Sequence, residues 1–281
     1  MQQTAPWSAT PAARISVRPQ HIGVGPVEVF DGDIDQATDL ILRAIDEGRG
    51  ARVATANLDF VARARRDAQL RHDLATSDLV TADGAPVAWL ARVAGAERIT
   101  RVTGVDLVAA LCARAASRPA GLRIAMYGST PEVAGAAARE LEARYPGVAV
   151  VAQICPPFRD LSDDELALHL AELSAVDPDV VLVALGCPRQ ERFIARHQHV
   201  APRAAWLGIG GTFDFYAGTR RRAPGLLQRV GGEWLARLVQ EPRRLWRRYF
   251  LDDIPALFAV APACLEARLR SPRAGDTASG E

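Results

Sequence analysis

The stretch DVVLVALGCPRQERFI, at residues 179–194, combines three patterns that together decide the fold. An apolar run of strand length is followed by a turn containing Gly186 and Pro188, and then by residues at helical spacing. In a sheet of parallel strands, such a turn lies at the carboxyl edge, where ligands bind. Gln190 and Glu191 come directly after the turn and are therefore candidates for a binding site.

The same alternation continues along most of the chain. Short apolar runs of strand length recur, and helical patterns lie between them. This alternation predicts an α/β fold with a Rossmann-like, mostly parallel sheet flanked by helices. The runs span residues 27–30, 52–57, 79–83, 122–128, 148–153, 179–186 and 204–210, and the helical stretches include 35–47, 104–116, 131–144 and 162–173.

The chain is predicted to divide into four segments. Residues 1–22 and 263–281 are rich in proline, alanine and small polar residues, so we expect both to be disordered. Residues 23–219 carry the strand and helix alternation and form the α/β domain. The alternation stops after residue 219, and residues 220–262 are predicted to form a basic, amphipathic helical appendage.

The composition is that of an ordinary soluble protein. The chain has 281 residues, of which 49% are hydrophobic, so it can bury a substantial core. All 34 basic residues are arginine, and the lack of lysine excludes P-loop ATPases, Schiff-base enzymes and lysine general bases. The four cysteines form no C-x-x-C pair, which argues against a zinc site and for a reduced, cytoplasmic setting. No apolar stretch reaches the ~18 residues of a membrane span, so no spanning helix is predicted. Binding to a membrane surface is still compatible with the sequence.

Residues 220–248 carry an excess of positive charge. Nine arginines stand against two glutamates, which gives a local net charge of +7. Arg237, Arg244 and Arg248, spaced by seven and four residues, are predicted to share one helical face. Arginine forks suit diphosphate groups, and a helix rich in arginine and aromatic residues also suits an anionic membrane surface. A solvated charged helix is the alternative.

Short polar residues follow two further strands. Asp83 ends the apolar run at 79–83 and precedes a helix, so its carboxylate is a candidate general base at the sheet's carboxyl edge. Thr55 and Asn57 end the run at 52–57 and are candidates for hydrogen bonds to a sugar or to Asp83. The alternative for Asp83 is a helix-capping or turn aspartate, and the alternative for Asn57 is a helix cap.

Glycines mark two more turns. The GST turn at 128–130 presents backbone N–H groups at the start of a helix, an arrangement that suits a phosphate. The GIGG stretch at 208–211 allows a ligand to approach the backbone closely. Because Phe213 stands where G-x-G-x-x-G would need its last glycine, a dinucleotide site is only weakly supported. A crossover turn that binds nothing is the alternative for the GST turn.

Two short patterns resemble metal sites, but local structure accounts for each of them. DGDID, at 31–35, has the D-x-D spacing of some metal–nucleotide sites, but Asp33 or Asp35 is predicted to cap the following helix. The histidines of RHQH, at 196–199, stand two residues apart, which points them to different sides of a helix. No metal site is therefore predicted.

Six blocks of the sequence occur in an order that resembles a known family. They extend from about residue 54 to residue 258, which is most of the chain. Each block is modest alone, but the six together resemble the WecG/TagA/CpsF family of bacterial glycosyltransferases. The blocks are TANLDFV (55–61), ADGAPVAWLAR (82–92), RVTGVDLV (101–108), GCPRQERFI (186–194), GIGGTFDFYAGTRRRAP (208–224) and EWLARLVQEPRRLWRRY (233–249).

The resemblance implies an inverting, metal-independent glycosyltransferase without a cofactor. It would move a sugar of the N-acetylmannosamine type from a UDP-sugar to a polyprenyl-diphosphate-linked sugar, in the synthesis of teichoic acid or another cell-surface polysaccharide. It also implies a cytoplasmic enzyme attached peripherally to the inner face of the cytoplasmic membrane, with no nucleic-acid partner, and it leaves room for a homo-oligomer. The alternatives are a UDP-glucose or glucuronate-type hexosyltransferase of exopolysaccharide synthesis, and a non-catalytic membrane-associated scaffold of the same pathway.

The resemblance also implies roles for particular residues. Asp83 matches the family's proposed base, with Thr55 and Asn57 beside it, and the appendage would act as a lid and membrane contact. Asp83 would take the proton of the acceptor hydroxyl as that oxygen attacks the anomeric carbon and UDP leaves, while arginines and backbone N–H groups stabilise the diphosphate. The expected substrate-binding residues are Gly128, Ser129, Gly186, Pro188, Gln190, Glu191, Gly211, Asp214, Arg237, Arg244 and Arg247.

Overall fold

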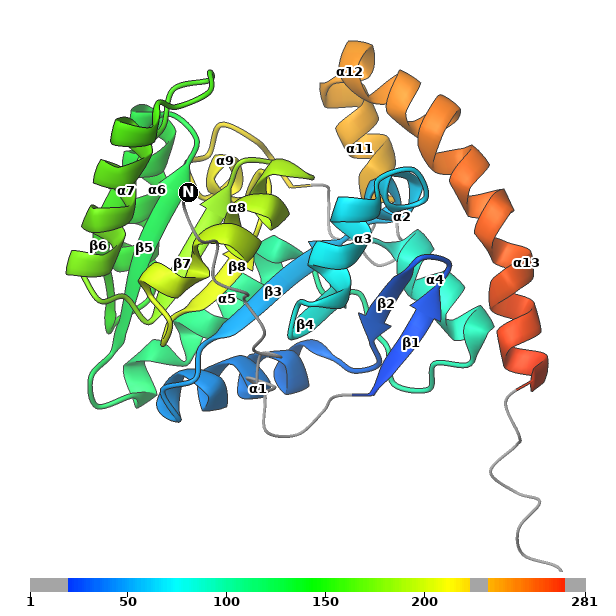
Figure 1. Ribbon diagram of the computed structural model, residues 1–281, viewed down its shortest axis with the longest axis horizontal. Coiled ribbons are helices and arrows are strands. Elements are labelled where there is room, and N and C mark those ends of the chain that lie inside the picture. Colours follow the sequence, from blue (N-terminus) through cyan, green and yellow to red (C-terminus); the bar gives the residue numbers. More distant parts are fainter. Residues whose placement is uncertain (1–19, 223–231, 271–281) are drawn as a thin grey trace, which may run out of the picture.

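A six-stranded sheet forms the centre of the protein in the computed structural model, which describes residues 20–222 and 232–270. Every neighbouring pair of strands is parallel, and the order across the sheet is β4-β3-β8-β7-β5-β6 (Figure 1). The predicted Rossmann-like α/β fold is confirmed. The strands are β3 (Ala51–Ala56), β4 (Leu79–Ala82), β5 (Leu122–Gly128), β6 (Val148–Ile154), β7 (Val180–Ala184) and β8 (Ala205–Gly208).

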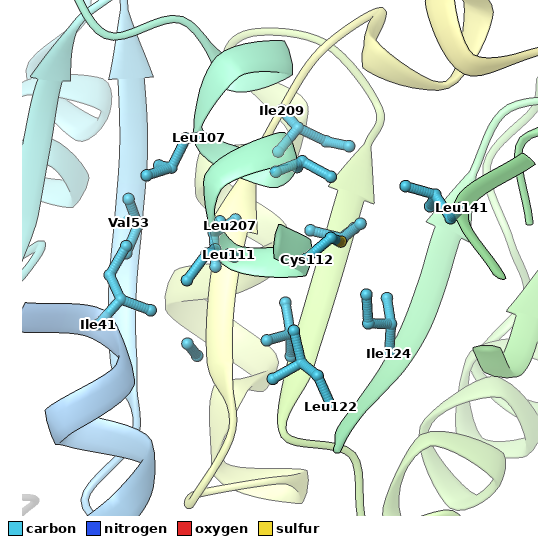
Figure 2. Packing of buried hydrophobic residues seen from close by; sticks show 14 of the residues in the cluster. Ile41, Val53, Leu107, Leu111, Cys112, Leu122, Ile124, Leu141, Leu207 and Ile209 are labelled. Atoms are coloured by element: carbon cyan, nitrogen blue, oxygen red, sulfur yellow. The ribbon is translucent and has the colours of Figure 1, made fainter. Parts of the chain in front are cut away.

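Helices cover both faces of the sheet, because successive side chains of a strand point in opposite directions. Val53 of β3 packs with Ile41 and Leu111 in one core, whereas its neighbour Ala54 packs in another. Figure 2 shows the first core, in which side chains of β3, β5 and β8 lie against those of α5. The first core contains residues of α1 (Ile34–Asp46), α5 (Gly104–Ala113), α6 (Pro131–Arg144) and α9 (Thr212–Tyr216), and the other two contain residues of α2 (Leu58–Ala64), α3 (Ala68–Ala75), α4 (Ala85–Ala94), α7 (Asp163–Ala175) and α8 (Arg189–His197).

Side chains cap the starts of two helices predicted from the sequence. The Thr130 side chain accepts a hydrogen bond from the Val133 N–H and so caps α6. Ser162 and Glu165 form a capping box at the start of α7. Each cap satisfies backbone N–H groups that the first helical turn leaves without a partner, so the helices start where the sequence places them.

The aspartates of the DGDID stretch have structural roles. Asp33 caps α1 in a capping box with Gln36, which confirms the capping alternative. The Asp31 carboxylate accepts hydrogen bonds from the backbone N–H groups of Glu97 and Arg98, at 3.1 and 2.9 Å. The first two aspartates of the stretch therefore fix the start of a helix and a loop.

A short antiparallel hairpin precedes α1. Its strands are β1 (His21–Val24) and β2 (Val27–Phe30). The expectation that residues 1–22 lack structure is corrected at its end, because β1 begins at His21. Val24 is fully buried in the same core as residues of α4 and of the C-terminal helix, and this packing holds the strand in place.

The C-terminal helix α13 (Ile254–Arg270) runs along the hairpin and α4 (Figure 1). Val260 and Cys264 are buried in the core that α13 shares with these elements. A Cβ atom added at Gly25 would lie 2.7 Å from Cγ1 of Val260, so the hairpin turn and the helix are in close contact. The expected end of the helical segment at residue 262 is therefore wrong, because Cys264 is buried beyond it and the helix continues to Arg270.

The chain leading to α13 changes helix type twice. Helix α11 (Glu233–Gln240) ends at a residue with a non-helical backbone, Glu241, with φ −131° and ψ 59°. Helix α12 (Pro242–Arg247) follows, and a π-helical turn, η3 (Arg248–Asp253), joins it to α13.

The break at Glu241 changes one prediction about the basic segment. A spacing of seven residues places two side chains on one face only if the helix is continuous between them. Arg237 lies before the break, whereas Arg244 and Arg248 lie after it. The prediction that these three arginines share one helical face is therefore wrong.

Candidate functional site

The carboxyl edge of the sheet carries a polar cleft of about 630 Å³. The segments that follow all six parallel strands contribute to its lining, as expected for the edge where such sheets bind ligands. The contributing residues include Asn57 after β3, Asp83 after β4, Ser129 after β5, Phe158 after β6, Gly186 after β7 and Gly210 after β8.

The structure brings together most of the site residues predicted from the sequence. Those that line the cleft are Thr55, Asn57, Asp83, Ser129, Gly186, Gln190, Gly211 and Asp214. Gly128, Pro188 and Glu191 are not among its lining residues. Gly128 instead ends β5, Pro188 precedes α8, and Glu191 is buried beneath the lining.

The predicted arginines are placed less completely. Arg247 is an exposed residue at the end of α12 and does not line the cleft. The side chains of Arg237 and Arg244 lie outside the described residues, so their predicted contacts with a substrate stay predictions.

Asp83 extends from the end of β4 into the cleft. Its backbone N–H donates to the carbonyl of Ala56 at 2.9 Å, which continues the pairing of β4 with β3. Helix α4 starts after it with Gly84 as N-cap, at φ +125°, and no side chain caps this helix. The helix-capping alternative for Asp83 is therefore wrong, and its half-buried carboxylate lines the cleft.

Thr55 and Asn57 link the end of β3 to its neighbours. The Thr55 hydroxyl donates to the carbonyl of Gly208 on β8 at 2.9 Å. The Asn57 side-chain oxygen accepts from the Asp59 N–H at 3.1 Å and caps α2, which confirms the capping alternative. Asn57 also lines the cleft, so one side chain both starts a helix and faces the site.

Gln190 joins two loops beneath the cleft. Its side-chain oxygen accepts from the backbone N–H groups of Gly186 and Gly210, both at 3.1 Å. Its amide nitrogen donates to Glu191 at 2.7 Å, and its side chain is 1% exposed. Gln190 therefore holds the loops after β7 and β8 together, and its contact with a substrate stays a prediction.

Glu191 is a buried carboxylate, 5% exposed, behind Gln190. One of its oxygens accepts the Gln190 bond, and the other has no hydrogen-bond partner among the described residues. Burial raises the pKa of Glu191 to about 7, and the hydrogen bond from Gln190 opposes this shift. Glu191 therefore supports Gln190 from behind, and its contact with a substrate stays a prediction.

Glu191→Gln is expected to stabilise the protein more at pH 8 than at pH 5. The folded-state pKa of Glu191 lies above the ordinary value of 4.5, so the folded protein binds this proton more tightly than the unfolded chain. The contribution of Glu191 to the free energy of unfolding is fully present below about pH 4.5 and is lost as the pH rises through about 7. Glutamine keeps an acceptor for Gln190 and removes the ionisation.

Urea unfolding of both proteins at pH 5 and pH 8 measures this difference. Exposed Glu172→Gln is the control, and its effect on stability should be small at both values. If Glu191→Gln raised the free energy of unfolding by the same amount at both pH values, the assignment of a raised pKa to this carboxyl would be contradicted.

A turn with left-handed backbone angles brings the start of α6 to the cleft. Gly128 has φ +112° and Ser129 has φ +66°. A Cβ atom at Gly128 would lie 2.6 Å from the carbonyl oxygen of Ala184, so only glycine fits beside β7. Ser129 and Thr130 line the cleft. A helix N-terminus with its N–H groups is therefore available there for an anionic group.

A second cavity, of about 280 Å³, lies between the body and the C-terminal helices. Its lining is largely apolar and includes Leu58 and Pro86 from the body and Tyr249 and Leu257 from the helices. Asn57, Asp83 and Arg248 line both this cavity and the polar cleft. The two spaces therefore meet at these three residues.

Sequence reasoning missed several residues of the cleft. Arg63 and Arg220 line it, as does Phe158, which is 84% exposed. Arg220 forms an ion pair with Glu241 at 2.9 Å, which ties the wall of the cleft to the start of α12. Two signals in the sequence could have indicated two of them. Phe158 is an isolated aromatic residue in the loop sequence PPFR, and Arg63 stands four residues after Asp59, at ion-pair spacing on a helix.

The C-terminal helices expose large apolar side chains. In the part of the chain that the structure describes, no helix combines the length and apolar character needed to cross a membrane. Yet several large apolar side chains on α11, α12, η3 and α13 are more than a third exposed: Trp234, Leu235, Val239, Trp246, Phe250, Leu251, Ile254, Phe258, Leu265 and Leu269.

Nearly the whole described chain matches one family of known proteins. Residues 22–271 match the model of the family described as "Glycosyl transferase WecG/TagA/CpsF family". The chain belongs to this family, which confirms the resemblance carried by the six sequence blocks. It is therefore a glycosyltransferase, an enzyme that transfers hexosyl groups.

Two curated relatives carry the same name, N-acetylglucosaminyldiphosphoundecaprenol N-acetyl-beta-D-mannosaminyltransferase. The protein of Bacillus subtilis (strain 168) is 30% identical over 204 residues, which are 73% of this chain and 77% of the relative. The protein of Bacillus spizizenii (strain ATCC 23059 / NRRL B-14472 / W23) is 31% identical over 204 residues, 73% of this chain and 76% of the relative.

Proposed function

We propose that this glycosyltransferase moves N-acetylmannosamine from a UDP-sugar to a sugar linked to a polyprenyl diphosphate, in the synthesis of a teichoic acid or a related cell-surface polysaccharide. The names of the two relatives support this choice of sugar and acceptor. The observation that carries the proposal is the meeting of a polar cleft and an apolar cavity at Asp83 and Asn57. A reaction that joins a nucleotide sugar to a lipid-linked sugar needs these two kinds of space on either side of its base.

The polar cleft suits the nucleotide-sugar donor. Its volume of about 630 Å³ is within the usual range of small-ligand sites. The diphosphate would lie at the start of α6, near Ser129 and Thr130, where helical N–H groups stabilise negative charge. Arg220 lies on the wall of the same cleft and adds positive charge. Phe158, which is largely exposed at the cleft, offers a flat apolar surface for the nucleobase.

The apolar cavity suits the lipid-linked acceptor. Tyr249, Ile254 and Leu257 would contact the first part of the prenyl chain. Arg101 also lines this cavity and would contact the acceptor diphosphate. The acceptor sugar would then lie beside Asp83, where the two spaces meet.

The reaction we propose is a direct displacement. The Asp83 carboxylate takes the proton of the acceptor hydroxyl, and that oxygen forms a bond to the anomeric carbon. The bond from the anomeric carbon to UDP breaks on the opposite side, so the configuration inverts and UDP leaves with the electron pair. The helix N-terminus and the arginines of the cleft stabilise the charge that develops on the diphosphate, without a metal ion.

The exposed apolar side chains of α11 to α13 would contact the inner face of the cytoplasmic membrane, where the acceptor is located. Helices that carry arginines and aromatic residues bind anionic membrane surfaces through both kinds of contact. Sedimentation with vesicles that contain anionic lipid tests this contact, and protein that stays in the supernatant contradicts it.

The test of the function is UDP release from a panel of UDP-sugars, with and without EDTA, in the presence of a short-chain polyprenyl-diphosphate-sugar acceptor. We expect turnover with UDP-N-acetylmannosamine and no effect of EDTA. Turnover only with UDP-glucose or UDP-glucuronate would replace the donor in the proposal. Loss of activity with EDTA would contradict the metal-independent reaction. A protein that binds UDP and turns over no donor would be a scaffold.

A further inference from the structure

The π-helical turn η3 places two charged residues on one side of the C-terminal helix. Hydrogen bonds in a π-helix join residues five apart, so the first and last residues of η3, Arg248 and Asp253, stack in successive turns. Nε of Arg248 lies 3.6 Å from the Asp253 carboxylate. The Asp253 side chain is 7% exposed, so this acid is a buried partner for the guanidinium.

Arg248 also contacts the end of strand β3. Its Nη2 atom donates a hydrogen bond to the side-chain oxygen of Asn57 at 3.1 Å, and its Nε atom lies 3.6 Å from the Asp59 carboxylate. Asp59 is itself nearly buried and forms a 2.9 Å ion pair with Arg63. Arg248 therefore connects the C-terminal helix to the same residue that caps α2 and lines both cavities.

These contacts fix the orientation of the Asn57 amide. Its side-chain oxygen accepts from the Asp59 N–H on one side and from Arg248 on the other. Two donors to one oxygen leave the amide plane little freedom to rotate. The C-terminal helix, through Arg248, thus determines how Asn57 is presented to the space beside Asp83.

We propose that Arg248 is a positioning residue that couples the seating of the C-terminal helix to the orientation of Asn57, with Asp253 holding the guanidinium in place. The inference rests on the proposed function, in which Asn57 faces the reacting sugar. Arg248 is distinct from the three arginines that the family resemblance implies, and it acts through Asn57.

Arg248→Lys is the discriminating variant. Lysine keeps a positive charge between Asp59 and Asp253 but lacks the planar fork that reaches Asn57 at the same time. We expect this variant to fold like the wild type and to lose about tenfold in kcat, with the KM for the donor nearly unchanged. A purely structural role for the charge would leave kcat at the wild-type value, and that result would overturn the proposal.

A double-mutant cycle on kcat tests the route through Asn57. In the Asn57→Ala background, Arg248→Lys should cause no further loss, because the amide that it positions is gone. Additive losses would overturn the proposal. Arg43→Lys, at an exposed arginine of α1, is the matched control and should keep the wild-type kcat.

Hydrogen exchange gives a readout that does not depend on activity. Amides of residues 57–64 and 245–258 should exchange faster in Arg248→Lys than in the wild type, whereas those of β5 and β7 should not change. If the wild type transfers no sugar, the proposed function fails, and this exchange comparison alone decides the coupling. Unchanged exchange in both segments would overturn it.

Discussion

Asp83→Asn is expected to lower the rate of sugar transfer by about 10²–10⁴-fold, the usual contribution of a general base. Asparagine has nearly the same shape, but its amide cannot take a proton from the acceptor hydroxyl. The Asp83 side chain takes no part in the backbone hydrogen bond from Asp83 to Ala56, and it does not cap α4, which starts after Gly84. The fold should therefore be retained. The loss should therefore lie in kcat.

Single-turnover measurement of UDP release checks this expectation, together with UDP binding by calorimetry. The affinity for UDP should stay close to that of the wild type, because the proposed contacts with the diphosphate, at Ser129 and Thr130, do not involve Asp83. Asp164→Asn, at an exposed position in the first turn of α7, is the control and should keep full activity. A variant of Asp83 that retains more than a tenth of the rate would remove this residue from the role of base.

Gln190→Ala is expected to destabilise the protein by about 2–4 kcal/mol and to abolish transfer. The variant removes the common acceptor of the Gly186 and Gly210 N–H groups and the donor to Glu191. The bond between Gln190 and Glu191 is buried and the two to the loops are part-buried, so water does not replace all three at low cost. The two loops would then separate, and both line the cleft.

Equilibrium unfolding in urea measures this loss, with Gln153→Ala as a control on the exposed side of β6. The control should change stability by less than about 0.5 kcal/mol. If Gln190→Ala unfolds at the same urea concentration as the wild type, the amide does not hold the loops together.

The sheet could be predicted from the sequence because its central strands are buried on both faces and therefore appear as continuous apolar runs. DVVLVAL shows this pattern, and each predicted run overlaps a strand of the structure. The carboxyl-edge position of Asn57 and Asp83 follows from the same pattern, since parallel strands end at one edge. This is why most of the predicted residues meet in one cleft.

Other features depend on contacts between residues far apart in the sequence. Whether Gln190 faces a ligand or a backbone N–H depends on the loop after β8, which lies 20 residues away. The pairing of Arg248 with Asn57 spans 191 residues and needs a π-helical turn that no local pattern announces. The continuation of α13 beyond residue 262 likewise depends on burial against the N-terminal hairpin.

The contact between Gly25 and Val260 joins the first and last elements that the structure describes. During synthesis, the hairpin emerges from the ribosome long before α13, and the sheet can assemble in the interval. The part of the apolar cavity's wall that α13 provides, at Ile254 and Leu257, is therefore added after the sheet. A nascent chain that stops before residue 254 would have the sheet and the cleft, but its apolar cavity would lack this part of the wall.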